Sequence, residues 1–84
     1  MRKGLLNTSQ KILTPQSGTT IYADYLEDKQ ILEVAFTGGK TYQYYGVDNL
    51  IWEEYKQVIL SGGSSGQFVN YKIKPIYLNY KQVK

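Results

Sequence analysis

The residues best able to do chemistry in this chain of 84 residues lie in a polar stretch near its C-terminal end. Lys72 and Lys74 flank one isoleucine, so an extended backbone would point both ammonium groups to the same side, where phosphates could meet them. Tyr71 offers a ring on which an unpaired base could stack. These side chains, with two further polar ones, form the predicted nucleic-acid site: Asn70, Tyr71, Lys72, Lys74 and Lys81.

A glycine-rich loop, SGGSSG at residues 61–66, precedes this site and superficially resembles a loop that cradles phosphates. It lacks the Gly-Lys-Ser/Thr ending of such loops, and it follows a predicted helix instead of a strand. We therefore expect no nucleotide-hydrolysis motif here. The predicted function is weak, salt-sensitive binding of RNA or DNA through residues 64–74, because the chain has one arginine and its sheet is not basic.

The composition argues against an enzyme. The chain has no histidine and no cysteine, which removes imidazole bases, thiol nucleophiles and the zinc sites that need those ligands. The adjacent carboxylates at Glu27-Asp28 and Glu53-Glu54 are typical of a solvated turn and of an early helical turn. We predict no catalytic residues, no metal and no cofactor.

Charge is unevenly distributed along the chain, although the net charge is only +3. Residues 1–19 and 62–84 carry three and four basic residues and no acid, whereas residues 20–61 carry seven acids and three lysines, a net of −4. Basic ends that fold onto one face would bind a polyanion. The alternative is that the lysines only keep the ends of the chain in solution.

The first residues, MRKGLL, contain an apolar run of only Leu5 and Leu6, too short for a signal peptide, and no stretch approaches the ~20 apolar residues of a membrane span. The lack of cysteine is compatible with a reducing compartment. We expect a cytoplasmic protein that does not contact a membrane.

The elements that must position the site begin with a predicted hairpin at residues 31–45. Leu32, Val34 and Phe36 alternate with polar or small residues, as do Tyr42 and Tyr44, which is the period of strands with one buried face. A three-residue loop, Gly38-Gly39-Lys40, would set Phe36 opposite Tyr42 and Val34 opposite Tyr44. The other face then meets water with Glu33, Thr37, Thr41 and Gln43.

A further strand is predicted at residues 20–25, joined to the hairpin by a polar loop at residues 27–30. If Leu26 pairs with Ile31, the buried faces agree, because Tyr25 then meets Leu32, Ala23 meets Val34, and Ile21 meets Phe36. The three strands would form an antiparallel meander with one apolar face.

A predicted helix supplies the cover for that face. Asp48 can cap its start, Val47 and Trp52 can form a hydrophobic staple, and Gly62 can end it. Its apolar stripe consists of Ile51, Trp52, Tyr55, Val58 and Ile59. A short helix or irregular segment should follow near residues 67–72. The predicted fold is α+β: a three-stranded antiparallel meander covered by one α-helix, with a short C-terminal helix or irregular segment.

This division leaves residues 1–16 as a flexible N-terminal extension, residues 17–80 as the domain and residues 81–84 as a tail. It also leaves an alternative function, in which the open outer face of the sheet docks a protein partner. The residues expected to contact that partner are Tyr22, Thr41, Gln43 and Tyr45. We expect a monomer or a weak homodimer, since an edge strand could pair with a second copy.

An ordered set of residues resembles the KTSC domain, a short module named after the C-terminal region of a lysyl-tRNA synthetase and also found as small bacterial and phage proteins. The set comprises Leu32-x-Val34-x-Phe36, Gly39, Tyr42-x-Tyr44, Val47, Ser64-x-Gly66-x-Phe68-x-Asn70, Ile73-Lys74 and Tyr77. The resemblance covers about residues 17–80 and implies a small α+β domain with no established enzymatic activity. Gly62 and Gly63 depart from the alanine and serine that the family pattern carries there.

Overall fold

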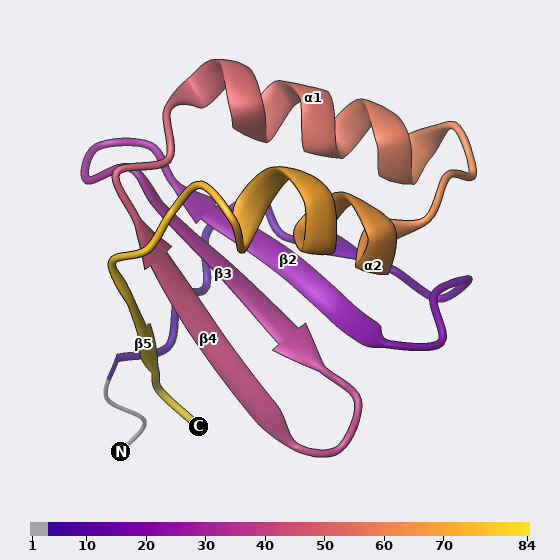
Figure 1. Cartoon of the computed structure of the whole chain (residues 1–84), viewed down its shortest axis with the longest axis horizontal. Helices are drawn as coiled ribbons and strands as arrows, with labels where there is room; N and C mark the ends of the chain where they lie inside the picture. The colour runs from indigo at the N-terminus through magenta and orange to yellow at the C-terminus, as the bar shows by residue number, and fades with distance from the viewer. Residues whose placement is uncertain (1–3) are drawn as a thin grey trace.

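The computed structural model, which describes residues 4–84, is a five-stranded antiparallel sheet with a helical layer over one face (Figure 1). Adjacent strands in the sheet follow chain order: β1 Ile12–Leu13, β2 Thr20–Leu26, β3 Ile31–Phe36, β4 Lys40–Tyr45 and β5 Tyr80–Gln82. Helix α1 spans Asn49–Leu60, and α2, Ser65–Phe68, continues into a π-helical turn, η1, at Val69–Ile73. The predicted α+β class is confirmed, but the sheet has five strands instead of three.

The two additional strands lie at the edges of the sheet. In β1, Ile12 pairs with Ala23, and in β5, Tyr80 pairs with Tyr44. The segments expected as a flexible extension and a tail therefore supply backbone pairing, although residues 1–3 of that extension lie outside the described residues. Strands of two and three residues are too short to show an alternating pattern, which is why the sequence did not indicate them.

The β2–β3 hairpin has the predicted register over most of its length, with Tyr25 opposite Leu32 and Ala23 opposite Val34. The pairing of Ile21 with Phe36 is wrong. A bulge between Thr20 and Tyr22 sets Thr20 opposite Phe36 and leaves Ile21 exposed. The bulge turns Thr20 inward, where its hydroxyl joins a buried hydrogen-bond network.

The β3–β4 turn is displaced from its expected place by one residue. It consists of Thr37, Gly38 and Gly39, with φ of 95° and 90° at the two glycines, so Phe36 lies opposite Lys40 and Val34 opposite Tyr42. Both glycines thus adopt the left-handed conformation that side chains disfavour. Because the register differs from the predicted one by two residues, every side chain still faces the expected side.

Helix α1 begins and ends where the sequence indicated. The Asp48 carboxylate accepts the Ile51 amide at 3.1 Å, and Gly62 follows the helix with φ of 86°. Gly63 donates its amide to the Val58 carbonyl, and a Cβ at Gly63 would lie 2.9 Å from a Val58 methyl group. The two glycines therefore let the chain turn back closely over the last turn of α1.

A column of aromatic rings joins the sheet to both helices. Trp52 of α1 stacks on Tyr25 of β2 with ring centroids 5.3 Å apart, and it meets Tyr55 in a T-shaped contact. Tyr55 in turn stacks on Phe68 of α2 at 4.8 Å. All four rings are buried, so Trp52 is a core residue as predicted.

A chain of buried hydroxyl groups crosses the same core. The Tyr55 hydroxyl lies 2.6 Å from Ser65 Oγ, Thr20 donates to Ser65 at 2.9 Å, and Thr14 lies 2.8 Å from Thr20. These residues come from α1, α2, β2 and the segment after β1. The network ties four separate parts of the chain together, and each hydroxyl keeps a partner after its removal from water.

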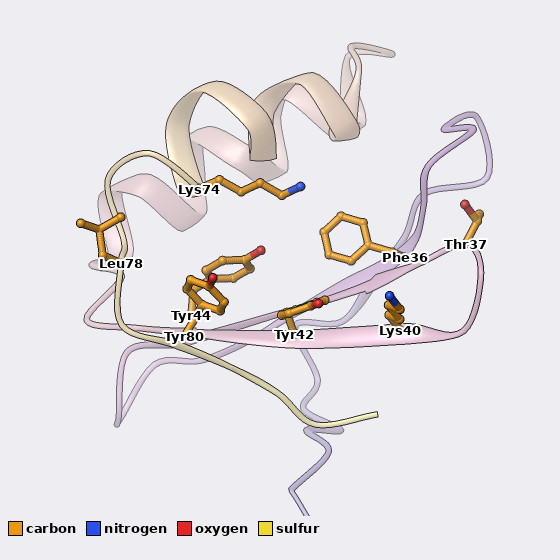
Figure 2. Close-up of a pocket in the computed structure, with 8 residues that line it drawn as sticks. All are labelled: Phe36, Thr37, Lys40, Tyr42, Tyr44, Lys74, Leu78 and Tyr80. Carbon is orange, nitrogen blue, oxygen red and sulfur yellow. The ribbon is translucent and has the colours of Figure 1, made fainter.

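The opposite, outer face of the sheet is covered by residues 4–8, which we call the N-terminal strap. This segment runs below the sheet in Figure 2. Glu33 accepts hydrogen bonds from the Leu6 amide and the Gln43 side chain, both at 2.8 Å, while Gln43 also donates to the Gly4 carbonyl. Thr8 binds the Asp24 carboxylate through its amide and its hydroxyl.

The expectation that Glu33, Thr41 and Gln43 meet water is therefore wrong, since all three are buried. The strap replaces water there with amide and hydroxyl donors, which a buried carboxylate requires. Thr37, in the β3–β4 turn, is exposed as expected.

We expect Ser65→Ala to lower the free energy of unfolding by about 1–3 kcal/mol, because it takes the buried Tyr55 and Thr20 hydroxyls away from their shared partner. Urea denaturation measures this. Ser61→Ala is the matched control: it removes an exposed hydroxyl that bonds only to the Val58 carbonyl, and it should change stability by less than about 0.5 kcal/mol. Equal losses in the two variants would contradict the importance of the network.

Glu33→Gln tests the strap. The substitution keeps the shape but replaces one acceptor oxygen with a donor, so the Leu6 amide, Gln43 or Tyr22 loses its acceptor. We expect a stability loss of about 2 kcal/mol and faster hydrogen exchange at the Leu6 amide. Glu27→Gln, in the exposed β2–β3 turn, is the control. Unchanged stability together with unchanged exchange at Leu6 would show that Glu33 does not hold the strap.

Candidate functional site

The predicted nucleic-acid residues do not form one cluster. Asn70, Tyr71 and Lys72 lie on η1 and are exposed, with Tyr71 retaining 72% of its accessible surface. The Lys72 ammonium group pairs with Glu54 of α1 at 3.4 Å, and both side chains are about half exposed. Such an exposed pair is worth at most about 1 kcal/mol, so Lys72 can exchange it for a phosphate at little cost.

Lys72 and Lys74 do not point to the same side, contrary to expectation. The prediction assumed an extended backbone, whereas residues 69–73 are π-helical and Lys74 keeps helical angles. Residues two apart in a helix lie on nearly opposite sides. Lys72 therefore reaches α1, while the Lys74 ammonium group lies 5.3 Å from the centroid of the Phe36 ring.

Lys74 lies at a groove between the sheet and the end of the helical layer. Figure 2 shows its side chain extending above the sheet toward Phe36, with the rings of Tyr42, Tyr44 and Tyr80 below it. The groove has a volume of about 420 Å³. Its lining residues come from β3, β4, β5 and the segments between elements: Phe36, Thr37, Lys40, Tyr42, Tyr44, Lys74, Leu78 and Tyr80.

The floor of this groove, which we call the aromatic groove, consists of rings in mutual contact. Phe36 meets Tyr42 edge to face with centroids 6.0 Å apart, and Tyr80 contacts both Tyr42 and Tyr44, at 6.0 and 5.7 Å. Tyr44 is buried, Tyr42 is half-buried and Tyr80 is 54% exposed. Tyr42 and Tyr44 thus pack on the core side as predicted, and Tyr42 and Tyr80 still offer ring surface to a ligand.

The electrostatics of the aromatic groove favour anions. Of the described residues that line it, two are lysines and none is acidic. Burial, together with the neighbouring Tyr42 and Tyr80 hydroxyls, raises the pKa of Tyr44 to about 12. Tyr44 therefore remains a neutral phenol at physiological pH and does not offset the two ammonium groups.

Lys81, the last of the predicted binding residues, lies away from this groove. It pairs with Gln43 in the β4–β5 ladder, next to Tyr80. Because successive side chains of a strand alternate, Tyr80 faces the groove and Lys81 faces the outer side of the sheet. Among the predicted residues, only Lys74 lines the aromatic groove.

The four residues of the alternative docking face lie together on the outer side of the sheet but are mostly occupied by other parts of the chain. Thr41 and Gln43 are only 4% and 5% exposed. Tyr45 is half-buried and donates to Gln43, and the Tyr22 hydroxyl donates to Glu33 at 2.7 Å. A partner would reach Gln43 only after the N-terminal strap moved away.

Of the eight groove residues, sequence reasoning identified only Lys74 as a binding residue. It missed the other seven: Phe36, Thr37, Lys40, Tyr42, Tyr44, Leu78 and Tyr80. The sequence pattern places Phe36 on the buried face of its strand and Lys40 in the hairpin turn, and it gives Tyr80, at the end of the predicted domain, no role. The available signal was the spacing of Lys40, Tyr42 and Tyr44, which places one ammonium group and two rings on the same face of a single strand.

The fold and the groove define a small α+β domain with a five-stranded antiparallel sheet, and a family model for the KTSC domain matches residues 16–77. The chain belongs to the KTSC domain family. It is 42% identical to a protein of Tsukamurella paurometabola over 53 residues, which are 63% of this chain and 73% of that protein. The crystal structure of a KTSC domain protein from Yersinia pestis has 32% identity and a TM-score of 0.62, covering 81% of this chain and 89% of that one.

The matched stretch contains β2 to β4 and the helical layer, with six of the eight groove residues. Leu78, Tyr80 and the N-terminal strap lie outside it. Within residues 4–84, none of the helices has the length and apolar composition that crossing a membrane requires.

Because two tyrosines are buried, we expect the free energy of unfolding to fall at high pH. Burial raises the pKa of Tyr55 to about 12, although its hydrogen bond with Ser65 acts in the opposite direction, and the pKa of Tyr44 is equally raised. Tyrosines of an unfolded chain ionise near pH 10. Between about pH 10 and pH 12 the unfolded chain thus releases protons that the folded chain keeps, so stability falls as pH rises and is unaffected at lower pH.

Urea midpoints measured from about pH 9 to about pH 11 test this expectation. The variant Tyr55→Phe should show a shallower decline, whereas Tyr71→Phe, which changes an exposed ring, should keep the wild-type slope. Equal slopes in both variants would contradict the role of Tyr55.

Proposed function

We propose that this protein is a small binding module without enzymatic activity, which binds single-stranded RNA or DNA weakly through the aromatic groove and the adjoining residues 64–74. The observation that carries the proposal is the combination of exposed ring surface at Tyr42 and Tyr80 with the ammonium groups of Lys40 and Lys74. Unpaired bases stack on aromatic rings, and lysines contact the phosphates between them.

The size of the groove supports this proposal. A volume of about 420 Å³ falls within the range of about 300–1,000 Å³ that is usual for ligand sites. A base of a duplex is stacked on its neighbours and could not enter, whereas an unpaired base can turn into the groove. The preference for single strands follows from that difference.

The charge of the site supports weak binding. Two lysines line the groove, and Lys72 is available on η1 after it leaves Glu54. Two phosphate contacts on a single strand predict a slope of log affinity against log salt of about −1.4. Asn70 and Tyr71 would contact the strand where it leaves the groove, because they lie on the turn that precedes Lys74.

The proposal includes no reaction. The groove offers amines, phenols, a hydroxyl and apolar groups, and Tyr44 holds its proton far above neutral pH. General acid–base catalysis needs a group whose pKa lies near the working pH. We also propose that the binding takes place in the cytoplasm, with which the lack of cysteine is compatible.

A protein partner docked at Tyr22, Thr41, Gln43 and Tyr45 has less support. The strap already provides the hydrogen bonds that the buried polar groups of that face need. A partner would have to replace all of them. We therefore retain nucleic-acid binding as the proposed function.

Fluorescence anisotropy with a labelled single-stranded 12-nucleotide RNA, and with the DNA of the same sequence, tests the proposal. We expect a Kd on the order of 10–100 μM at about 50 mM salt, weakening about sevenfold at about 200 mM salt. A duplex of the same length should bind more weakly. Absence of binding at the lower salt, where electrostatic contacts are strongest, would rule the proposal out.

Matched variants locate the site. Lys40→Gln should reduce the affinity and make the salt slope shallower by about 0.7, whereas Lys29→Gln, which removes the same charge from the β2–β3 turn, should leave both unchanged. Tyr80→Ala removes an exposed stacking surface, worth about 1–3 kcal/mol per base, and Tyr71→Ala is its counterpart on η1. If Tyr71→Ala lowers the affinity and Tyr80→Ala does not, the binding site lies on η1 and not in the groove.

A further inference from the structure

Lys74 occupies a position that a ligand of the aromatic groove would need. Its backbone amide donates to the Val69 carbonyl at 2.8 Å, which anchors the residue at the end of η1. Its exposed side chain extends across the groove, and its ammonium group lies 5.3 Å from the Phe36 ring centroid (Figure 2). This is the geometry of a cation–π contact within the protein itself.

The Phe36 ring is the part of the groove that this contact blocks. Phe36 is half-buried, and the edge-to-face contact with Tyr42 holds its ring in place. A base stacked on Phe36 would lie in van der Waals contact with the ring face, where the Lys74 ammonium group now lies. Stacking and the cation–π contact on that face exclude each other.

We propose that Lys74 is a specificity-determining residue, which makes the aromatic groove select phosphate-bearing nucleotides over uncharged aromatic compounds. This inference rests on the proposed function. An uncharged ring must displace the ammonium group of Lys74 from Phe36, and it has no anionic group with which that ammonium group could then pair. A nucleotide also displaces it, but the ligand phosphate then becomes its new partner.

Lys40 provides a contrast within the same groove. It lies opposite Phe36 in the β3–β4 ladder, and its charge would attract a phosphate. The ammonium group placed over the Phe36 ring is that of Lys74. Loss of Lys40 should weaken nucleotide binding and leave the affinity for an uncharged ring unchanged. Loss of Lys74 should weaken nucleotide binding and also raise the affinity for an uncharged ring.

The test compares adenosine 5′-monophosphate with adenosine by NMR titration of the full chain, using wild type, Lys74→Ala and Lys40→Ala. In wild type, the monophosphate should bind about tenfold more tightly than adenosine. In Lys74→Ala, adenosine should bind about two- to fivefold more tightly than to wild type, because the ring face is uncovered, and the monophosphate should bind more weakly. In Lys40→Ala, the monophosphate should weaken and adenosine should not gain.

The decisive result is the gain in adenosine affinity. The inference is wrong if adenosine binds Lys74→Ala no more tightly than it binds wild type, or if adenosine binds neither of these two proteins. If the labelled 12-nucleotide strand binds but neither small ligand does, the inference fails and the proposed function stands. If neither the strand nor the monophosphate binds wild type, the proposed function itself fails. Wild-type dispersion of amide shifts in both variants confirms that they fold.

Discussion

Strand β3 is buried on both of its faces, and this constraint governs the rest of the structure. Leu32 and Val34 face the helical layer, while Glu33 and Ala35 face the other side, and all four are buried. A sheet with two covered faces normally belongs to a larger domain with three layers. In this chain the second cover is the N-terminal strap, residues 4–8, which binds the polar outer face through hydrogen bonds instead of packing on it as a helix.

The extent of the helical layer explains where the aromatic groove lies. The helical layer ends with η1, and the chain then continues to the edge of the sheet beside β4, where it forms β5. Lys40 and Tyr42 of β4 line the groove on this side of the sheet. Tyr80 of β5 partly fills this space by packing on Tyr42 and Tyr44. What remains is a hollow lined by rings and ammonium groups at the end of the core.

Local patterns predicted the central elements, because their causes are local. Asp48 caps α1 through a side chain three residues from its partner, and Trp52 falls on the apolar stripe of that helix. The edge strands, the strap and the groove depend on contacts between distant residues, such as Tyr44 with Tyr80 and Leu6 with Glu33. No periodicity of a two- or three-residue segment encodes such contacts.

Two errors have specific physical causes. Glu33 alternates like a solvated residue, and only the strap, about 27 residues earlier in the chain, makes its burial possible. The prediction that Lys72 and Lys74 share a side assumed an extended backbone, yet the Ser64 side chain caps α2, and helical geometry continues to Lys74. The divergence of the two lysines takes Lys72 to α1 and places Lys74 in the groove.

The account depends most directly on the aromatic groove being the ligand site, and chemical shift mapping measures that. On addition of a short single-stranded oligonucleotide at about 50 mM salt, where electrostatic contacts are strongest, the account predicts the largest changes at Phe36, Lys40, Tyr42, Lys74 and Tyr80. Changes confined to the outer face, at Tyr22, Thr41, Gln43 and Tyr45, would contradict it.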